Sequence, residues 1–159
     1  MLFRNPKKVV YVITAFLALF LLTLATKCRA AELEFGAGST FVRGQTAVVD
    51  LTLSGPIDGL EANWQGSLTL VGSSTYGEAE QPNNFALQGL LVDGIGKLDV
   101  GLGVAYLQNT DRYNGSSLNF ALQLAYRLGD FKITVRHWSN AGTRAPNLGR
   151  DFVLLSYRF

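Results

Sequence analysis

The stretch LNFALQLAYRL, from Leu118 to Leu128, alternates large apolar residues with small or polar residues at every step. Successive side chains of a β-strand point to opposite faces of the sheet, whereas an α-helix repeats its apolar positions every three or four residues. The stretch therefore predicts a strand with one bulky face and one small, polar face. The bulky row comprises Leu118, Phe120, Leu122, Leu124, Tyr126 and Leu128, and the opposite row comprises Asn119, Ala121, Gln123, Ala125 and Arg127.

Seven more segments repeat this alternation, each bounded by clusters of Gly, Asn, Asp or Pro. Their bulky rows are Leu33, Phe35 and Ala37; Ala47, Val49, Leu51 and Leu53; Leu60, Ala62, Trp64, Leu68 and Leu70; Phe85, Leu87 and Leu91; Leu98, Val100, Leu102, Val104 and Tyr106; Phe131, Ile133 and Val135; and Val153, Leu155, Tyr157 and Phe159. Short connections (54–59, 93–97, 129–130) alternate with long ones (72–84, 108–116, 140–150), and only 42–45 departs from that order. This pattern predicts an antiparallel meander of eight strands.

The alternation fits a soluble barrel with its bulky rows inside or an outer-membrane barrel with its bulky rows facing lipid. An eight-stranded lumen is narrow and accepts the row Asp99, Gly101, Gly103 and Ala105 more readily than a row of large residues. Membrane barrels also carry aromatic girdles at both interfaces, and the aromatic residues near segment ends are Phe41, Tyr106, Tyr126, Trp138, Tyr157 and Phe159. The sequence therefore predicts an all-β fold, an eight-stranded antiparallel transmembrane β-barrel.

Residues 1–30 have the composition of a cleaved signal peptide. Arg4, Lys7 and Lys8 precede an apolar run from Val9 to Thr26, and Cys28-Arg29-Ala30 provides small residues for a cut after Ala30. We therefore expect a signal peptide over 1–30 and an outer-membrane β-barrel over 31–159, in an integral, multi-pass protein of a Gram-negative outer membrane. The alternative is a permanent helical anchor, since the apolar run approaches the roughly 20 residues that span a bilayer.

Composition and charge narrow the chemistry further. The 159 residues are 48% hydrophobic and 16% charged, which suits one domain and not a disordered chain. A single Cys and a single His exclude a disulfide scaffold and a metal site built on several imidazoles, so no metal and no cofactor are expected. Without residues 1–30 the chain carries 9 basic and 12 acidic residues, a net charge of −3, and no basic patch indicates nucleic-acid binding.

The residue types of a serine-hydrolase triad occur near the last two segments. His137 and Ser139 lie at the end of the seventh, and Asp151 begins the eighth. A serine hydroxyl needs a neighbouring imidazole to take its proton, and a carboxylate orients that imidazole. Strand parity puts all three side chains on the bulky faces, toward lipid, and equal counts from Phe131 and Phe159 predict Ser139 and Asp151 at the same height. The alternative is that polar residues near a barrel rim only meet lipid headgroups.

The segment HWSNAG (137–142), followed by Pro146-Asn147 and an acid at position 151, resembles the active-site segment of the PagL-type lipid A 3-O-deacylases. The resemblance implies an eight-stranded outer-membrane barrel with a serine-hydrolase site on its outer wall. It implies Ser139 as nucleophile, His137 as general base and Asp151 as the acid of the triad, with Asn147 and the backbone N–H of Gly142 in the oxyanion hole. Known members carry Glu where this chain has Asp151, which is one methylene shorter.

The same resemblance implies two-step acyl transfer, in which Ser139 attacks the ester at the 3-position of lipid A and water then releases a 3-hydroxy fatty acid. Lipid A or lipopolysaccharide is the expected substrate, outer-membrane lipids surround the barrel, and the terminal Phe159 resembles the residue that the barrel assembly machinery recognises. The oligomeric state stays open, a homodimer included. Arg136, Arg144 and Arg150 are candidates for contacts to lipid A phosphates, because guanidinium suits phosphate, with solvated loop charge as the alternative.

Two other functions fit parts of the sequence. A non-enzymatic structural or adhesive outer-membrane barrel would use its long loops and leave the polar trio incidental. A periplasmic lipocalin-like carrier would turn the bulky rows inward, which the terminal Phe159 argues against. Loss of one hydroxyacyl mass from lipid A separates the enzyme from the structural barrel.

Overall fold

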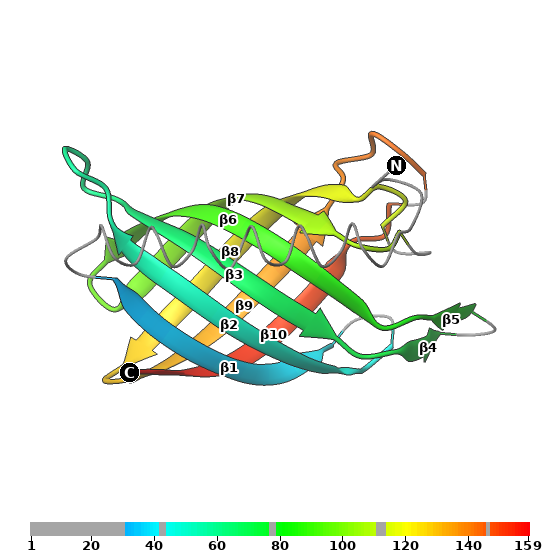
Figure 1. The fold of residues 1–159 in the computed structure, drawn as a ribbon, viewed down its shortest axis with the longest axis horizontal. Helices are drawn as coiled ribbons and strands as arrows, with labels where there is room; N and C mark the ends of the chain where they lie inside the picture. The colour runs from blue at the N-terminus through cyan, green and yellow to red at the C-terminus, as the bar shows by residue number, and fades with distance from the viewer. Residues whose placement is uncertain (1–30, 42–43, 77–78, 111–113, 146) are drawn as a thin grey trace, which may run out of the picture.

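Eight strands close into one antiparallel barrel in the computed structural model (Figure 1). They are β1 (Glu32–Thr40), β2 (Ala47–Pro56), β3 (Asn63–Val71), β6 (Asn84–Ile95), β7 (Leu98–Leu107), β8 (Leu118–Leu128), β9 (Phe131–Ser139) and β10 (Arg150–Arg158). Each strand pairs with the next barrel strand along the chain, and β1 pairs with β10 to close the ring. Closure leaves the barrel itself without an open edge, as a barrel in a membrane requires, and the predicted eight-stranded meander is confirmed.

The structure describes residues 31–41, 44–76, 79–110, 114–145 and 147–159. The predicted signal peptide over 1–30 and Pro146 therefore lie outside the described residues. Across the described ranges, no helix is long and apolar enough to span a membrane.

The connection between β3 and β6 is more ordered than the sequence predicts. Within the expected loop 72–84, β4 (Ser74–Tyr76) and β5 (Ala79–Gln81) pair as a separate two-stranded sheet. Figure 1 shows this hairpin projecting beyond the barrel at the end where the orange connection between β9 and β10 also lies, whereas the C-terminus is at the opposite end. The hairpin was not predicted because its strands are only three residues long, too short to show an alternating pattern.

The bulky rows face outward and the small, polar rows face the lumen. On β8, Leu122 is 52% exposed whereas its neighbour Gln123 is 3% exposed. The same alternation of exposed and buried residues runs along β2, β7 and β9. The prediction that the small, polar row of β7 faces the lumen is also confirmed, since Asp99 and Ala105 are buried. An apolar exterior around a polar interior is the arrangement of an outer-membrane barrel.

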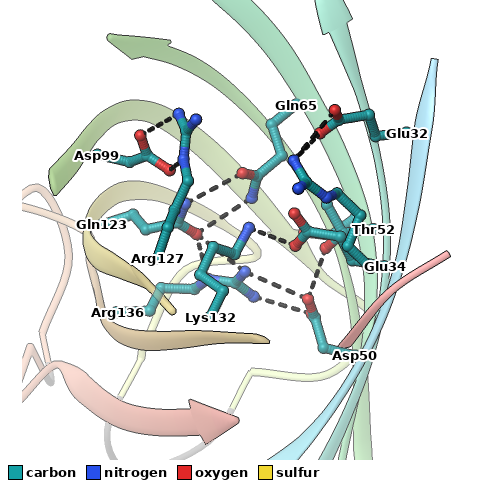
Figure 2. Close-up of polar contacts among 12 residues, drawn as sticks. Glu32, Glu34, Asp50, Thr52, Gln65, Asp99, Gln123, Arg127, Lys132 and Arg136 are labelled. Carbon is teal, nitrogen blue, oxygen red and sulfur yellow. Dashed lines mark hydrogen bonds and ion pairs between the residues drawn. The ribbon is translucent and has the colours of Figure 1, made fainter. Parts of the chain in front are cut away.

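A polar network centred on Arg136 fills the middle of the lumen (Figure 2). Its guanidinium donates from Nη1 to Asp50 Oδ1 (2.9 Å) and from Nη2 to Gln123 Oε1 (3.0 Å). Asp50 also accepts from Thr52 (2.7 Å) and Thr69 (2.5 Å), while Gln65 and Gln123 exchange two amide hydrogen bonds. These groups are buried, so each hydrogen bond offsets part of the desolvation cost that an unpaired polar group would carry.

Paired charges line the lumen toward the C-terminal end of the barrel. Arg127 pairs with Asp99, and Lys132 pairs with Glu34 (Figure 2). These four residues border a cavity of about 320 Å³. Buried polar side chains therefore fill much of the interior, and this cavity lies among the paired charges.

Trp138 contradicts the prediction that it belongs to an interfacial girdle. It is 1% exposed and points into the lumen, where its ring packs against Phe152 with a centroid separation of 4.4 Å. Its indole Nε1 donates to Gln88 Oε1 at 2.5 Å. The even parity of position 138 on β9 already places it with Thr134 and Arg136, so the period-two rule outweighs the aromatic preference for interfaces.

Candidate active site

Strands β9 and β10 bring the predicted trio together on the outer wall of the barrel. His137 and Ser139 belong to the outward row of β9, and Asp151 is the second residue of β10. The register pairs Asp151 with His137 directly. The sequence predicted Asp151 at the same height on the barrel as Ser139. This prediction is wrong by two residues, because Tyr157 and not Phe159 lies opposite Phe131.

His137 and Asp151 are joined by a hydrogen bond of 2.8 Å between Nδ1 and Oδ1. Their side chains are 39% and 25% exposed, so both reach the outer surface. A carboxylate that accepts from Nδ1 fixes the imidazole tautomer and leaves Nε2 as the proton acceptor. The pair therefore has the geometry of the base and acid of a hydrolase triad.

Ser139 is held by the loop that follows it. Its Oγ donates to Asn147 Oδ1 (3.0 Å) and accepts from the backbone N–H of Ala141 (3.1 Å). Within the described contacts the hydroxyl thus faces Asn147 and not the imidazole. On the other side, β8 places the exposed Phe120 opposite Ser139. The hydroxyl therefore lies where an apolar wall meets a polar loop.

A tight turn shapes the start of this loop. The Thr143 N–H donates to Asn140 O (3.1 Å), and the two central residues, Ala141 and Gly142, both have positive φ, 53° and 77°. Positive φ at both positions defines a type I′ turn. Alanine is rarely found in this region and costs about 1 kcal/mol there. The strained turn directs the Ala141 N–H at Ser139, a contact that the sequence did not predict.

Asn140 organises this turn, a role that was not predicted from the sequence. The side chain is 1% exposed, its Oδ1 accepts from the Gly142 N–H (3.0 Å) and its Nδ2 donates to Arg144 O (2.7 Å). Its backbone N–H donates to Asn147 Oδ1 (3.0 Å). The N–H of Gly142, expected in the oxyanion hole, is thus engaged by Asn140. An Asn directly after Ser139 and before Ala-Gly is a turn signal that could have been recognised.

Asn147 is anchored from a second loop. An isolated antiparallel bridge pairs Asn147 with Asn114, which lies in the connection between β7 and β8 and is fully buried. The Asn147 amide oxygen accepts from both Ser139 and Asn140, so its Nδ2 is the atom that can donate to a substrate. No sequence signal links positions 114 and 147, because their contact depends on loops that meet above the barrel.

The backbone at Gly149 lies close to the imidazole of His137. It has a φ of 70°, and a Cβ atom at this position would stand 2.5 Å from His137 Cε1 and 3.1 Å from Nε2. Only glycine fits both the backbone conformation and the space. The close approach of the backbone at Gly149, directly before β10, therefore limits where the ring can lie.

The three candidate arginines have different positions. Arg136 is buried in the lumen against Asp50, so the prediction of a contact with an external lipid is wrong for this residue. Arg150 is 4% exposed, whereas Arg144 is exposed on the loop. Among the described residues no cluster of three His, Cys, Asp or Glu side chains could hold a metal ion.

Fold and site together define a class of protein: an eight-stranded membrane-type barrel that carries its candidate active site on the outer wall. The family model described as "PagL: Lipid A 3-O-deacylase (PagL)" matches residues 34–159. The chain belongs to this family of lipid A deacylases, as the resemblance implied. No curated protein matches the chain.

A solved structure, "Crystal structure of the outer membrane enzyme PagL", is similar to this chain with a TM-score of 0.55 and 20% sequence identity. The match covers 82% of this chain and 99% of that one. At this identity the likeness supports the fold, and the outer-membrane barrel of the family agrees with the apolar exterior described above.

Proposed function

We propose that this lipid A deacylase is a serine hydrolase that removes the ester-linked 3-hydroxyacyl chain at the 3-position of lipid A. The observation that carries the proposal is the 2.8 Å hydrogen bond between His137 and Asp151 on the outer wall, beside Ser139. Polar groups on a lipid-facing surface are costly, so a paired His and Asp there favour a functional role. The substrate chains lie in the same leaflet as the site.

The reaction begins with proton transfer from Ser139 to His137. The hydroxyl gives up its hydrogen bond to Asn147 and turns toward Nε2, which takes the proton as Oγ attacks the ester carbonyl carbon. Asp151 stabilises the imidazolium through Nδ1. His137 then returns the proton to the sugar oxygen as the carbon–oxygen bond breaks, which leaves an acyl-serine that water hydrolyses to a 3-hydroxy fatty acid.

The oxyanion is stabilised by the Asn147 amide and the Gly142 N–H. Asn147 is anchored by the bridge to Asn114 and can donate from Nδ2. The Gly142 N–H donates to Asn140 Oδ1 in the resting structure and exchanges this partner for the substrate oxygen. A donor aimed at the developing charge contributes about 3 to 4 kcal/mol to catalysis.

The proposal extends to the cell. Residues 1–30 are the cleaved signal peptide, and 31–159 span the outer membrane with the β9–β10 loop on the outside. Phe131, Tyr157 and Phe159 form a chain of edge-on ring contacts near the C-terminus, with centroid separations of 5.2 and 5.1 Å. This cluster is the surface we propose for recognition of Phe159 by the assembly machinery. A homodimer remains compatible with the exposed apolar wall.

Purified protein and lipid A in detergent, analysed by tandem mass spectrometry, test the function. The wild type is expected to remove one hydroxyacyl group from the 3-position. Ser139→Ala is expected to lose at least about 10⁴-fold in rate, because a triad without its nucleophile retains only binding and the oxyanion hole. The Ser139→Ala variant should still fold, since Ser139 lies outside the lumenal core. Its migration in gels should therefore change on heating as that of the wild type does.

Ser156→Ala serves as the matched control, because this serine is buried on the lumenal face of β10. It should retain wild-type deacylation. An unchanged rate in Ser139→Ala would refute the nucleophile, and unaltered lipid A with wild-type protein would favour the structural barrel. Loss of a chain from another position would refute the regiochemistry alone.

A further inference from the structure

The loop above Ser139 presents one exposed cation to the space where a lipid headgroup would lie. Of the described cations at this end of the barrel, Arg150 is buried and Arg144 is exposed. At the opposite end, the exposed Lys97 occupies the turn between β6 and β7. Arg144 is therefore the described cation that can reach a substrate held at Ser139 from the headgroup side.

The backbone of Arg144 is fixed close to the nucleophile. Asn140, the residue after Ser139, donates from its buried side chain to the carbonyl of Arg144 at 2.7 Å. The type I′ turn also holds Thr143, the residue before Arg144, against Asn140. Thr143 donates to Asn140 O through both its N–H (3.1 Å) and its hydroxyl (2.8 Å). One hydrogen bond thus links the backbone of Arg144 to Asn140, which directly follows Ser139. The long side chain of Arg144 extends from this fixed point.

The polarity of the surroundings orients the substrate. The apolar residues Phe120, Leu122 and Val135 are exposed beside and below Ser139, and the polar loop 140–144 follows it. An amphiphilic ester at Ser139 must place its acyl chain along the apolar wall and its sugar at the loop. In lipid A a phosphate stands on the same glucosamine as the 3-linked ester, so the phosphate comes to the height of Arg144.

We propose that Arg144 forms a headgroup subsite that binds the phosphate of the sugar whose ester is cleaved. This inference rests on the proposed deacylase function and adds a determinant of substrate selection to it. The planar guanidinium binds phosphate oxygens in a bidentate fashion. Because Arg144 is exposed to water, its contribution is limited, and we expect about a tenfold effect on kcat/KM.

The test uses the full barrel in neutral detergent micelles, so that the substrate carries the only lipid anion. Deacylation of phosphorylated lipid A is compared with that of chemically dephosphorylated lipid A. The wild type should favour the phosphorylated form about tenfold. Arg144→Ala should lose this preference through KM while its rate on the dephosphorylated form stays unchanged, because Asn140 holds the carbonyl and not the side chain.

Two further variants sharpen the test. Arg144→Lys should keep part of the preference for the phosphorylated substrate, because the positive charge stays and the bidentate guanidinium is lost. Lys97→Ala should behave as the wild type. Equal losses on both substrates in Arg144→Ala would overturn the subsite and indicate a role in shaping the loop. An unchanged preference would also overturn it.

Calorimetric binding of phosphorylated lipid A in the same micelles separates this proposal from the reaction itself. Binding should weaken about tenfold in Arg144→Ala and remain intact in Ser139→Ala. Wild-type protein that binds the phosphorylated lipid selectively but releases no fatty acid would refute the deacylase mechanism and leave the subsite standing. Wild-type protein that binds both lipids equally would refute the subsite.

Discussion

Strand β9 carries polar side chains on both of its faces, and the two faces differ in how completely these side chains are bonded. On the lumenal face, Arg136 is 2% exposed and bonded to Asp50, Gln123 and Thr69. On the outer face, the side chain of His137 is 39% exposed and is hydrogen-bonded to one side chain of the described residues, Asp151. Both faces hold a cation-forming side chain opposite a carboxylate at 2.8 to 2.9 Å, yet only the outer pair can be approached by another molecule.

This contrast separates a structural pair from the pair that we propose to be reactive. A fully bonded buried pair contributes to the stability of the native barrel and is expensive to break from one side. A partly exposed pair contributes little to stability, and its remaining donor and acceptor capacity is available for a reaction. Substitution of the acid in each pair should therefore affect different properties.

The largest effect is expected from Asp151→Asn. The amide cannot orient the imidazole with Nδ1 protonated, and the corresponding loss in serine hydrolases is about 10⁴-fold in kcat. Stability should change by less than about 1 kcal/mol, because the side chain is partly exposed. Deacylation kinetics and denaturant unfolding of the same preparation measure both quantities.

Asp151→Glu is the control for this prediction. It keeps the carboxylate and restores the residue that the known family members carry, so it should stay within about tenfold of the wild type. A fully active Asp151→Asn variant would remove Asp151 from the proposed mechanism. An inactive Asp151→Glu would indicate that the spacing between β9 and β10 in this chain is adapted to the shorter acid.

The next effect concerns the lumenal pair. Asp50→Asn leaves the buried Arg136 without its counter-charge and turns an NH₂ group toward donors from Thr52 and Thr69. We expect the free energy of unfolding to fall by about 3 to 5 kcal/mol. The molecules that remain folded should deacylate at a rate within about threefold of the wild type, because Asp50 lies on the other side of the wall. A stable but inactive Asp50→Asn barrel would contradict the separation of the two faces.

Strand parity explains how much of this contrast was available from the sequence. Once the alternation was recognised, the outward positions of His137 and Ser139 and the inward position of Gln123 followed from the geometry of a strand. The error on Trp138 shows the limit of residue preference, since the position was even and hence lumenal. Local backbone geometry therefore carried more information than residue type.

Contacts across the barrel could not be predicted in the same way. Arg136 and Asp50 are 86 residues apart, and their meeting depends on strand tilt and stagger, which fix the opposite wall. The height of Asp151 was missed for a related reason. The register between β9 and β10 depends on how far the C-terminus extends past Phe131. A shift of two residues leaves the alternation of inward and outward side chains unchanged, so the pattern could not reveal it.

The loop residues Asn140 and Asn114 were missed because their roles arise from tertiary contacts. Asn140 bonds within a turn that exists only when Ala141 and Gly142 adopt positive φ. Asn114 meets Asn147 from a different connection. The family resemblance implied the roles that we propose for Ser139, His137 and Asn147, whereas the residues that support them could be found only in the folded chain.

The smallest predicted effect tests whether the outer pair is held in place by the backbone beside it. Gly149→Ala introduces a Cβ atom 2.5 Å from His137 Cε1, so the ring must move away from its position against Asp151. We expect kcat to fall about tenfold and stability to fall by about 1 kcal/mol, the latter from the left-handed backbone. Steady-state kinetics and denaturant unfolding check the two values.

Gly129→Ala separates the steric effect on His137 from the backbone effect. Gly129 has a φ of 66°, close to the 70° of Gly149, but a Cβ atom there meets nothing within 4 Å. The two substitutions should therefore destabilise the barrel by similar amounts, and only Gly149→Ala should slow deacylation. Equal rates in the two variants would mean that His137 adapts freely to its neighbours, and the fixed position of the imidazole would then have to come from Asp151 alone.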